Sequence, residues 1–264
     1  MLQQVFTDWS QFQHELSGLS PVHPVHGQLV RLWRGQRAQW PLASAWERYA
    51  EACLARVSEA ERAAERHRLE QVQQWLENRF RKHLAGTNRL KQMETGGLEL
   101  CWAYGRHYGL ITPLLDWSES PYLALFLGLA DLYGFKANHD PSGRIELHED
   151  DQVVLYQFDV DAELRHYSCP EGTLKVIDLN SDDSRLVAQK GLFTWLQSDR
   201  HFNLESFLAQ TRKQERLRRL VLKGRSILID AGIDLRQHGI DWRTVYPDLQ
   251  GAALATNALL QDIV

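Results

Sequence analysis

The residues best suited to bind an anion form a triplet, Trp33-Arg34-Gly35, in the first part of the chain. An arginine side chain can hold a phosphate or a carboxylate with two parallel hydrogen bonds. Gly35 lacks a side chain and would let the backbone come close to a ligand. Interleaved apolar residues predict a strand over residues 29–34, which places the guanidinium at a strand end. The triplet therefore predicts an anion-binding arginine, with a structural salt bridge as the alternative.

A second group of polar, aromatic and turn-forming residues runs from Arg106 to Ser120. His107 and Tyr108 offer ring faces that can stack on a planar heterocycle or hydrogen-bond to it, and Gly109 allows a turn beside them. For His107 and Tyr108, the alternative is an ordinary packing role. Packing alone rarely requires so many such residues in sequence, so this segment predicts a ligand pocket.

The end of this segment immediately precedes a predicted helix that begins at Pro121. Ser120 fits the cap position of that helix, and the free amides of a helix start favour an anion near Ser118 and Glu119. Asp116 is expected to anchor the loop by accepting backbone amides. Residues 121–133 are apolar nearly all round, which predicts a buried helix that holds the segment rigid.

Two further groups of residues lie in the second half of the chain. Arg185 and Gln189 are one helical turn apart and share a face, so they are candidate ligand contacts or an ordinary surface pair. The basic run 212–225 could contact a nucleic-acid backbone. The leucines interleaved with its arginines favour instead an element with one buried face.

Helices and short strands alternate along the chain without an internal repeat, which predicts an α+β fold rather than a regular βαβ series. We predict one domain over residues 1–264, with residues 1–24 as an N-terminal helix and loop extension and residues 58–84 as a long helical insertion. Ser58 and Glu61 form a capping-box pattern at the start of that insertion. The predicted strands span residues 29–34, 153–160, 174–179 and 192–196, the other predicted helices span residues 8–18, 98–104, 121–133, 181–188, 226–238 and 248–263, and residues 136–151 form a loop.

Composition and missing motifs exclude several classes of protein. The formal net charge of −4 gives no overall attraction to nucleic acid or anionic lipid. Three scattered cysteines and a mixed polar N-terminus predict a cytoplasmic protein without disulfides, and no apolar run is long enough to cross a bilayer. The sequence lacks the glycine-rich, P-loop, G-x-S-x-G and H-E-x-x-H motifs. His23 and His26 have no third ligand nearby, so no metal site is predicted.

In this order, the motifs resemble the FRG domain family, named for its Phe-Arg-Gly triplet, over about residues 25–255. Residues 106–126 are similar to the family's block QHYGLPTRLLDWTxSPxxALFFA, with Arg106 in place of the usual Gln and Pro113 in place of the usual Arg. The family pattern R-x-x-x-Q-x-G-x-F is matched from Arg185 to Phe193, and residues 246–251 are close to its FPDLxG.

This resemblance implies an ADP-ribosyltransferase-like fold, a split β-sandwich with flanking helices that binds NAD in its cleft. In one branch of that superfamily, an arginine on the first strand holds NAD, a serine motif braces the site and a glutamate stabilises the reacting sugar. Carried over residue by residue, Arg34 matches the arginine, Ser118 and Ser120 fall near the serine motif, and Gln189 falls near the third position. With the residues already considered, the predicted NAD contacts are Arg34, Gly35, His107, Tyr108, Gly109, Ser120 and Arg185. The predicted catalytic residues are Ser118, Glu119 and Gln189.

The resemblance breaks at the catalytic carboxylate, because Gln189 is neutral and cannot stabilise a cationic sugar as a glutamate would. Glu119 or Asp116 would then have to supply the missing charge. The leading hypothesis is an NAD-dependent ADP-ribosyltransferase-like protein, or an NAD glycohydrolase, acting as a toxin or anti-phage effector on a protein or nucleic-acid acceptor. The alternatives are a non-catalytic module that binds NAD or a related nucleotide on the same fold, and a nucleic-acid-binding protein.

Overall fold

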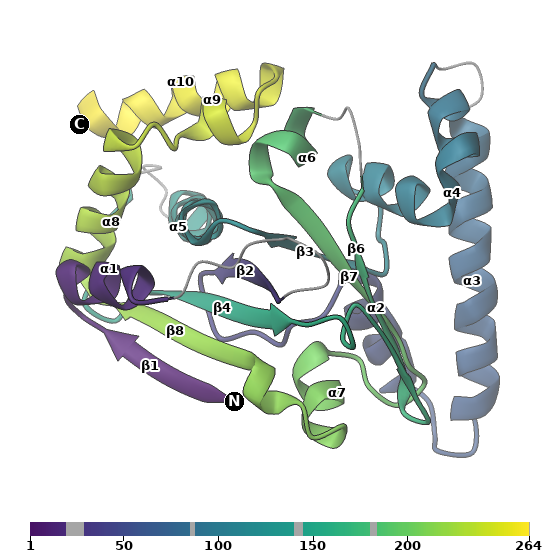
Figure 1. Cartoon of the computed structure of the whole chain (residues 1–264). Helices are drawn as coiled ribbons and strands as arrows, with labels where there is room; N and C mark the ends of the chain where they lie inside the picture. The colour runs from purple at the N-terminus through teal and green to yellow at the C-terminus, as the bar shows by residue number, and fades with distance from the viewer. Residues whose placement is uncertain (20–28, 85–87, 140–144, 180–183, 264) are drawn as a thin grey trace.

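A single open sheet of eight strands forms the centre of the computed structural model (Figure 1), which describes residues 1–19, 29–84, 88–139, 145–179 and 184–263. The strand order is β1-β8-β4-β2-β3-β7-β6-β5, and all neighbours are antiparallel except β1 and β8. The predicted α+β class is therefore confirmed. The strands are β1 (Leu2–Phe6), β2 (Val30–Gln36), β3 (Leu114–Ser118), β4 (Gln152–Val160), β5 (His166–Cys169), β6 (Gly172–Ile177), β7 (Gly191–Gln197) and β8 (Leu217–Lys223).

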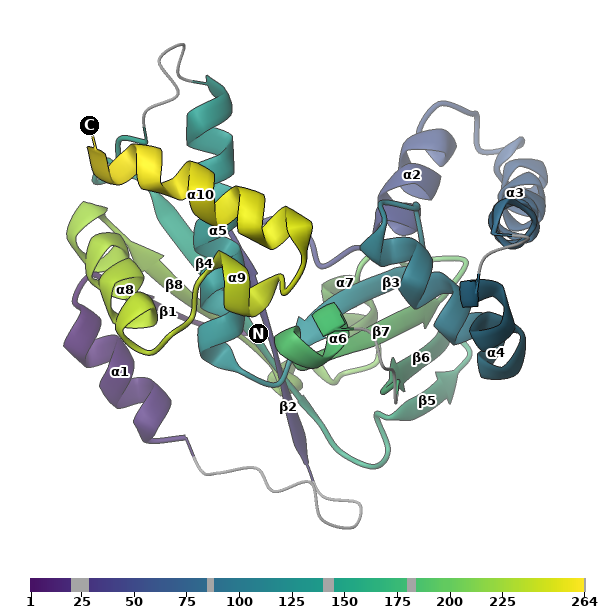
Figure 2. The same cartoon turned by 90° about the horizontal axis from the view of Figure 1, so that it is seen from above.

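The sheet is nearly divided between β2 and β3, whose backbones pair at one position only, Trp33 opposite Ser118. Figure 2 shows the two halves diverging on either side of β2. Residues from both halves nevertheless share one hydrophobic core, in which the rings of Trp117 and Phe158 lie 5.7 Å apart. The sheet thus bends around this core. Because of the bend, β2 and β3 separate on moving away from their one paired position.

One face of the first half is covered by the apolar helix α5 (Pro121–His139), together with α8 (Arg225–Gln237) and α1 (Trp9–Ser17). Leu125 and Leu129 of α5 are buried, which confirms the buried helix predicted from its composition. The contact between α5 and β2 is unusually close at Gly35, where a Cβ atom would lie only 1.9 Å from the carbonyl oxygen of Ala124. The glycine of the triplet is therefore required by helix packing, and it also lines the cavity described below.

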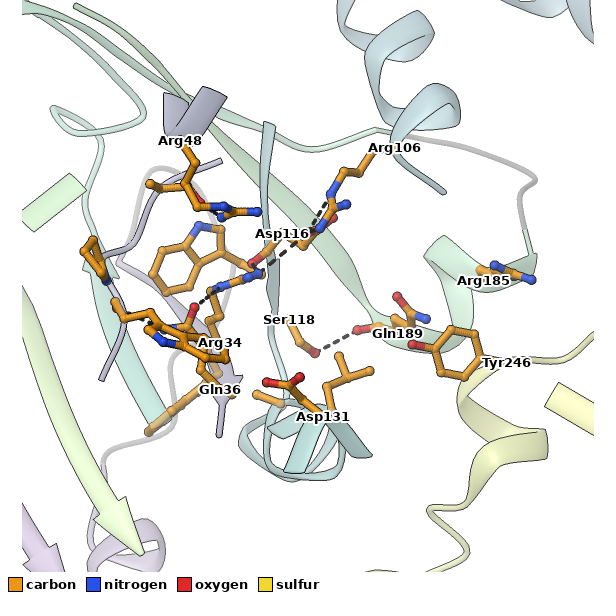
Figure 3. Close-up of a pocket in the computed structure, with 18 of the residues that line it drawn as sticks. Arg34, Gln36, Arg48, Arg106, Asp116, Ser118, Asp131, Arg185, Gln189 and Tyr246 are labelled. Carbon is orange, nitrogen blue, oxygen red and sulfur yellow. Dashed lines mark hydrogen bonds and ion pairs between the residues drawn. The ribbon is translucent and has the colours of Figure 1, made fainter. Parts of the chain in front are cut away.

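The alternation of side chains along β2 explains the composition of the triplet. Successive residues of a strand point to opposite faces of the sheet. Trp33 packs in the same core as α5, and Gly35 touches that helix, so both residues serve the α5 face. Arg34, which lies between them, projects from the other face toward β3 (Figure 3).

Most of the remaining helices lie around the second half of the sheet, whereas the last two helices of the chain lie over α5, where the rings of Phe126 and Trp242 are 5.2 Å apart. Helices α3 and α4 lie side by side in both views, and Leu69 is the one buried residue of α3, as expected for a mostly charged helix. These helices are α2 (Ala45–Leu54), α3 (Arg62–His83), α4 (Asn88–His107), α6 (Ser184–Gln189), α7 (Leu204–Gln210), α9 (Trp242–Val245) and α10 (Leu249–Ile263), with a short 3-10 turn, η1, over Gln214–Arg216.

Several boundaries differ from those predicted. The insertion helix begins at Arg62 rather than at residue 58, because the Ser58 amide and hydroxyl both hydrogen-bond to Glu61 in a turn ahead of it. Strand β3 lies within the segment predicted to be loop, and α5 extends into the predicted loop 136–151. Strands β1 and β5 and helix α2 are additional elements. Residues 140–144 and 180–183, together with His23 and His26, lie outside the described residues.

The basic run 212–225 forms η1, β8 and the start of α8, with one apolar side in the core as the interleaved leucines predicted. Three of its cations form ion pairs within the fold: Lys213 pairs with Glu163 at 2.9 Å, Arg216 with Asp161 at 2.6 Å and Arg218 with Glu15 at 2.7 Å. These pairs favour a structural role for the run over contact with a nucleic-acid backbone.

A buried carboxyl group at the start of α2 makes stability depend on pH. Glu47 forms a capping box with Ser44, and burial raises the pKa of Glu47 from 4.5 to about 8. The folded protein then retains a proton that the unfolded chain releases above pH 4.5, so the free energy of unfolding is expected to fall as pH rises from 4.5 to about 8. The slope is at most about 1.4 kcal/mol per pH unit.

Glu47→Gln should flatten this dependence in urea unfolding, because a neutral amide has no proton to lose. Glu61 is a matched control, since it makes the same type of capping contact on the surface and its pKa is lowered by the Ser58 hydrogen bonds. Glu61→Gln should leave the slope above pH 4.5 unchanged. A slope that survives Glu47→Gln would show that another group causes it.

Candidate functional site

A cavity of about 840 Å³ opens where β2 and β3 separate (Figure 3). Its walls come from β2, β3, α2, α4, α5, α6 and the segment after α9. Four arginines and three carboxylates line it, together with aromatic and apolar side chains. The charged lining residues are Arg34, Arg48, Arg106, Arg185, Glu51, Asp116 and Asp131.

Arg34 spans the gap between the two separated strands. Its Nη1 atom donates to the backbone carbonyl of Asp116 at 2.9 Å, and its Nε atom donates to Gln36 at 3.4 Å. The side chain is 18% exposed, so one part of the guanidinium is buried in the wall and another part reaches the cavity. Arg34 thus satisfies a strand carbonyl near the end of the β2–β3 pairing while remaining available to a ligand.

Asp116, which was predicted to anchor a loop, lies against two guanidinium groups through its side chain. Its Oδ2 atom accepts from Nε and Nη2 of Arg106 at 3.0 and 2.9 Å, and it lies 3.6 Å from Nη1 of Arg34. Asp116 is a residue of β3 and Arg106 is in the last turn of α4. Arg34 and Arg106, together with Arg48 of α2, form what we call the cationic wall of the cavity. The Asp116 carboxylate joins the first two of these residues and offsets part of the wall's positive charge.

Arg48 adds a third guanidinium from α2, where its Nη1 atom donates to the carbonyl of Ala43 at 2.6 Å. Burial lowers the pKa of Arg48, and the neighbouring Arg106 lowers it further. Burial likewise lowers the pKa of Arg34; Asp116 opposes this shift, and Arg106 and Arg48 add to it. Like charges in a partly buried cavity repel each other, and a bound anion would relieve that repulsion.

The opposite end of the cavity is formed by α6 and the chain around α9. Ser118 is buried, and its hydroxyl donates to the carbonyl of Gln189 at 2.7 Å. The Gln189 amide in turn donates to the carbonyl of Val245 at 3.3 Å. Arg185 pairs with Asp248 and donates to Gln250 at 2.8 Å, and its guanidinium lies 5.5 Å from the ring of Tyr246. Arg185 and Gln189 both line the cavity, as their shared helix face predicted.

The part of the chain that supplies most of the cavity matches a known family. Residues 30–133 match the FRG domain. The match spans β2 through most of α5, and so includes Arg34, Arg48, Arg106, Asp116, Ser118 and Asp131 of the cavity. No curated protein and no solved structure matches the chain.

Some residues of the FRG segment that the sequence suggested as ligand contacts lie away from the cavity lining. Tyr108 is 68% exposed, and Glu119 is also exposed and contacts Lys190 through its backbone amide. Ser120 caps α5 by accepting from the Leu123 amide at 3.3 Å, as predicted. Gly109 adopts a φ of 89°, the left-handed conformation suited to its turn. The side chain of His107 lies outside the described part of the chain.

The structure also adds residues that sequence reasoning missed. Arg48 and Glu51 come from α2, whose start was recognisable from the S-x-x-E pattern of Ser44 and Glu47. Asp131 is the one charged residue within positions 121–133, and a charge in an otherwise apolar helix is itself a signal. Tyr246 belongs to the closing motif that resembled the family, although no role had been assigned to it.

Within the described ranges, two other features that would indicate a function are absent. Among those residues, no group of three or more His, Cys, Asp or Glu side chains is arranged to hold a metal ion. No helix in the same ranges combines the length and apolarity needed to cross a membrane.

Proposed function

We propose that the chain is an NAD-binding, ADP-ribosyltransferase-like protein whose cavity holds the pyrophosphate of NAD against Arg34, Arg48 and Arg106. The observation that carries this proposal is the convergence of three guanidinium groups, from β2, α2 and α4, on one side of the cavity, where Asp116 pairs with two of them. A pyrophosphate supplies the negative charge that this wall lacks, and guanidinium groups match phosphate oxygens in shape and charge.

The size and lining of the cavity agree with a dinucleotide. Its volume of about 840 Å³ falls within the range typical of small-molecule sites. Trp40 and Tyr246 line it with aromatic faces on which a base or the nicotinamide ring can stack. The nucleotide would therefore contact charge along the Arg34 wall and aromatic surface at the ends.

The architecture gives further support. The resemblance to FRG domains implies a split β-sandwich, and here the sheet halves share one core and separate beside Arg34 of β2. Ser118 ties β3 to the end of α6 through its hydrogen bond to Gln189, which agrees with a bracing role for that serine.

In the proposed reaction the bond between nicotinamide and the ribose C1′ atom breaks, and nicotinamide leaves with the electron pair. The cationic sugar then bonds to an acceptor nucleophile, which loses its proton, or to water. The resemblance extends the proposal to a toxin or anti-phage effector that modifies a protein or a nucleic acid.

A binding module without catalysis is the second candidate. Gln189 is neutral and Glu119 is exposed away from the cavity lining, so neither position implied by the resemblance supplies a carboxylate to the sugar. This candidate predicts that NAD binds and stays intact.

A calorimetric titration with NAD, followed by an assay for nicotinamide release and for label transfer from NAD to protein, DNA and RNA, distinguishes the two. Binding with release or transfer supports the enzyme, and binding without either supports the module. If the protein shows no heat of binding with millimolar NAD, the nucleotide proposal is wrong.

A further inference from the structure

A carboxylate on α5 faces the cationic wall from another side of the cavity. Asp131 lines the cavity, and in Figure 3 its side chain points toward the space between Arg34 and Ser118. The side chain is 45% exposed, so a ligand in the cavity can reach it. None of the motifs that resemble the family includes this residue.

The other two carboxylates of the cavity belong to the cationic wall. Asp116 accepts from Arg106 at 2.9 and 3.0 Å and lies 3.6 Å from Arg34, so it is already engaged with the guanidinium groups proposed to hold the pyrophosphate. Glu51 is on α2, three residues after Arg48, and thus lies beside one of the wall's own cations. A ligand bound to the cationic wall would therefore lie between that wall and Asp131.

Asp131 is held in place by the same helix contact that requires Gly35. Ala124, Gly128 and Asp131 are spaced four and three residues apart, so they lie on one face of α5. Ala124 and Gly128 pack directly against Gly35 and Gln36 of β2. This face therefore continues from the tight helix–strand contact to the cavity, where it ends in Asp131.

Arg37, the residue after β2, fixes the carboxylate further. Its backbone amide donates to Asp131 at 3.3 Å and its Nε atom lies 3.7 Å from the carboxylate. The Arg37 guanidinium is itself enclosed between the rings of Trp40 at 4.3 Å and Phe135 at 3.7 Å, which restricts its movement. Arg37 thus acts as a positioning residue.

We infer that Asp131 is the carboxylate that stabilises the cationic ribose as nicotinamide leaves, an inference that rests on the proposed function. The C1′–N bond breaks, its electron pair leaves with nicotinamide, and positive charge develops on the sugar near the Asp131 carboxylate. The acceptor oxygen or water then bonds to C1′ and gives its proton to Asp131, which returns it to solvent. Asp131 thus supplies the carboxylate that Gln189 and Glu119 do not provide to the sugar.

The test compares the full chain with its Asp131→Asn variant in two measurements, NAD binding by calorimetry and nicotinamide release in a single turnover. Because the amide keeps the size of the side chain but lacks its charge, binding should change less than about threefold, whereas release should slow by about 100-fold or more. Asp159→Asn is the control, since Asp159 forms an ion pair of similar type with Arg31 at 2.8 Å away from the cavity. It should leave release unchanged.

The outcomes separate the inference from the proposed function. A wild-type protein that binds and cleaves NAD, with an Asp131→Asn variant that cleaves it equally fast, would overturn the inference alone. Wild-type binding without any nicotinamide release would also overturn it and would leave the binding module. A wild-type protein that does not bind NAD would overturn the proposed function itself.

Discussion

Gly35→Ala is expected to destabilise the protein by about 3 kcal/mol or more, a large part of the stability of an ordinary domain. The added Cβ would lie 1.9 Å from the carbonyl oxygen of Ala124, 2.8 Å from its carbon and 2.9 Å from the amide nitrogen of Gly128. All three are backbone atoms of α5, so no side-chain rotation can relieve the overlap. Helix α5 would have to move away from β2, and the packing of both would be lost.

Urea unfolding, or the soluble yield if the variant does not fold, measures this effect. Gly134→Ala is a control in the same helix, because a Cβ there meets nothing within 4 Å. Alanine is the better helix former, so this variant should gain about 0.5–1 kcal/mol. A Gly35→Ala protein as stable as the wild type would mean that α5 does not pack against β2 as described.

Arg34→Gln is expected to weaken NAD binding about 10- to 100-fold. A hydrogen bond to a charged group contributes about 1.5–3 kcal/mol, which corresponds to this range of affinity. Arg34→Lys should recover only part of the loss, because an ammonium keeps the charge but not the paired geometry of a guanidinium. Calorimetric titration of each variant with NAD gives the comparison.

The matched control for Arg34 is Arg31 on the same strand. Arg31 is also partly buried and forms an ion pair, with Asp159 at 2.8 Å, but it does not line the cavity. Arg31→Gln should therefore cost a similar amount of stability and leave NAD affinity within about twofold. Equal loss of affinity in both variants would indicate a general effect on the fold rather than a ligand contact at Arg34.

Local periodicity was enough to place some of the fold and the site. The apolar composition of residues 121–133 gave a buried helix, and Arg185 and Gln189 reach one cavity because residues four apart share a helix face. Arg34 donates to β3 because strand alternation turns its side chain to the face opposite that of Trp33 and Gly35. Each of these inferences needed only residues close in sequence.

Two neighbouring residues that were predicted to act together, Ser118 and Glu119, lie in different places. Ser118 ends β3 and lines the cavity, whereas Glu119, the next residue, lies outside the lining and is exposed. Strand β3 was not predicted. It is only five residues long and buried on both faces, so its apolar residues do not show the alternation typical of a strand.

The cationic wall depends on tertiary structure and could not be read from any one segment. Arg48 and Arg106 lie on separate helices, and only the packing of α2 and α4 beside β3 brings both to Asp116. The positions of Arg48 and Arg106 in the sequence do not indicate that the two side chains line the same cavity.

The most direct test of the central claim is a crystal structure of the protein with NAD bound. We predict that pyrophosphate oxygens lie within hydrogen-bond distance, about 2.7–3.2 Å, of the Arg34 guanidinium, with the phosphates between β2 and α4. If NAD occupies another surface and the cavity beside Arg34 stays empty, the claim that these guanidinium groups form a nucleotide site is contradicted.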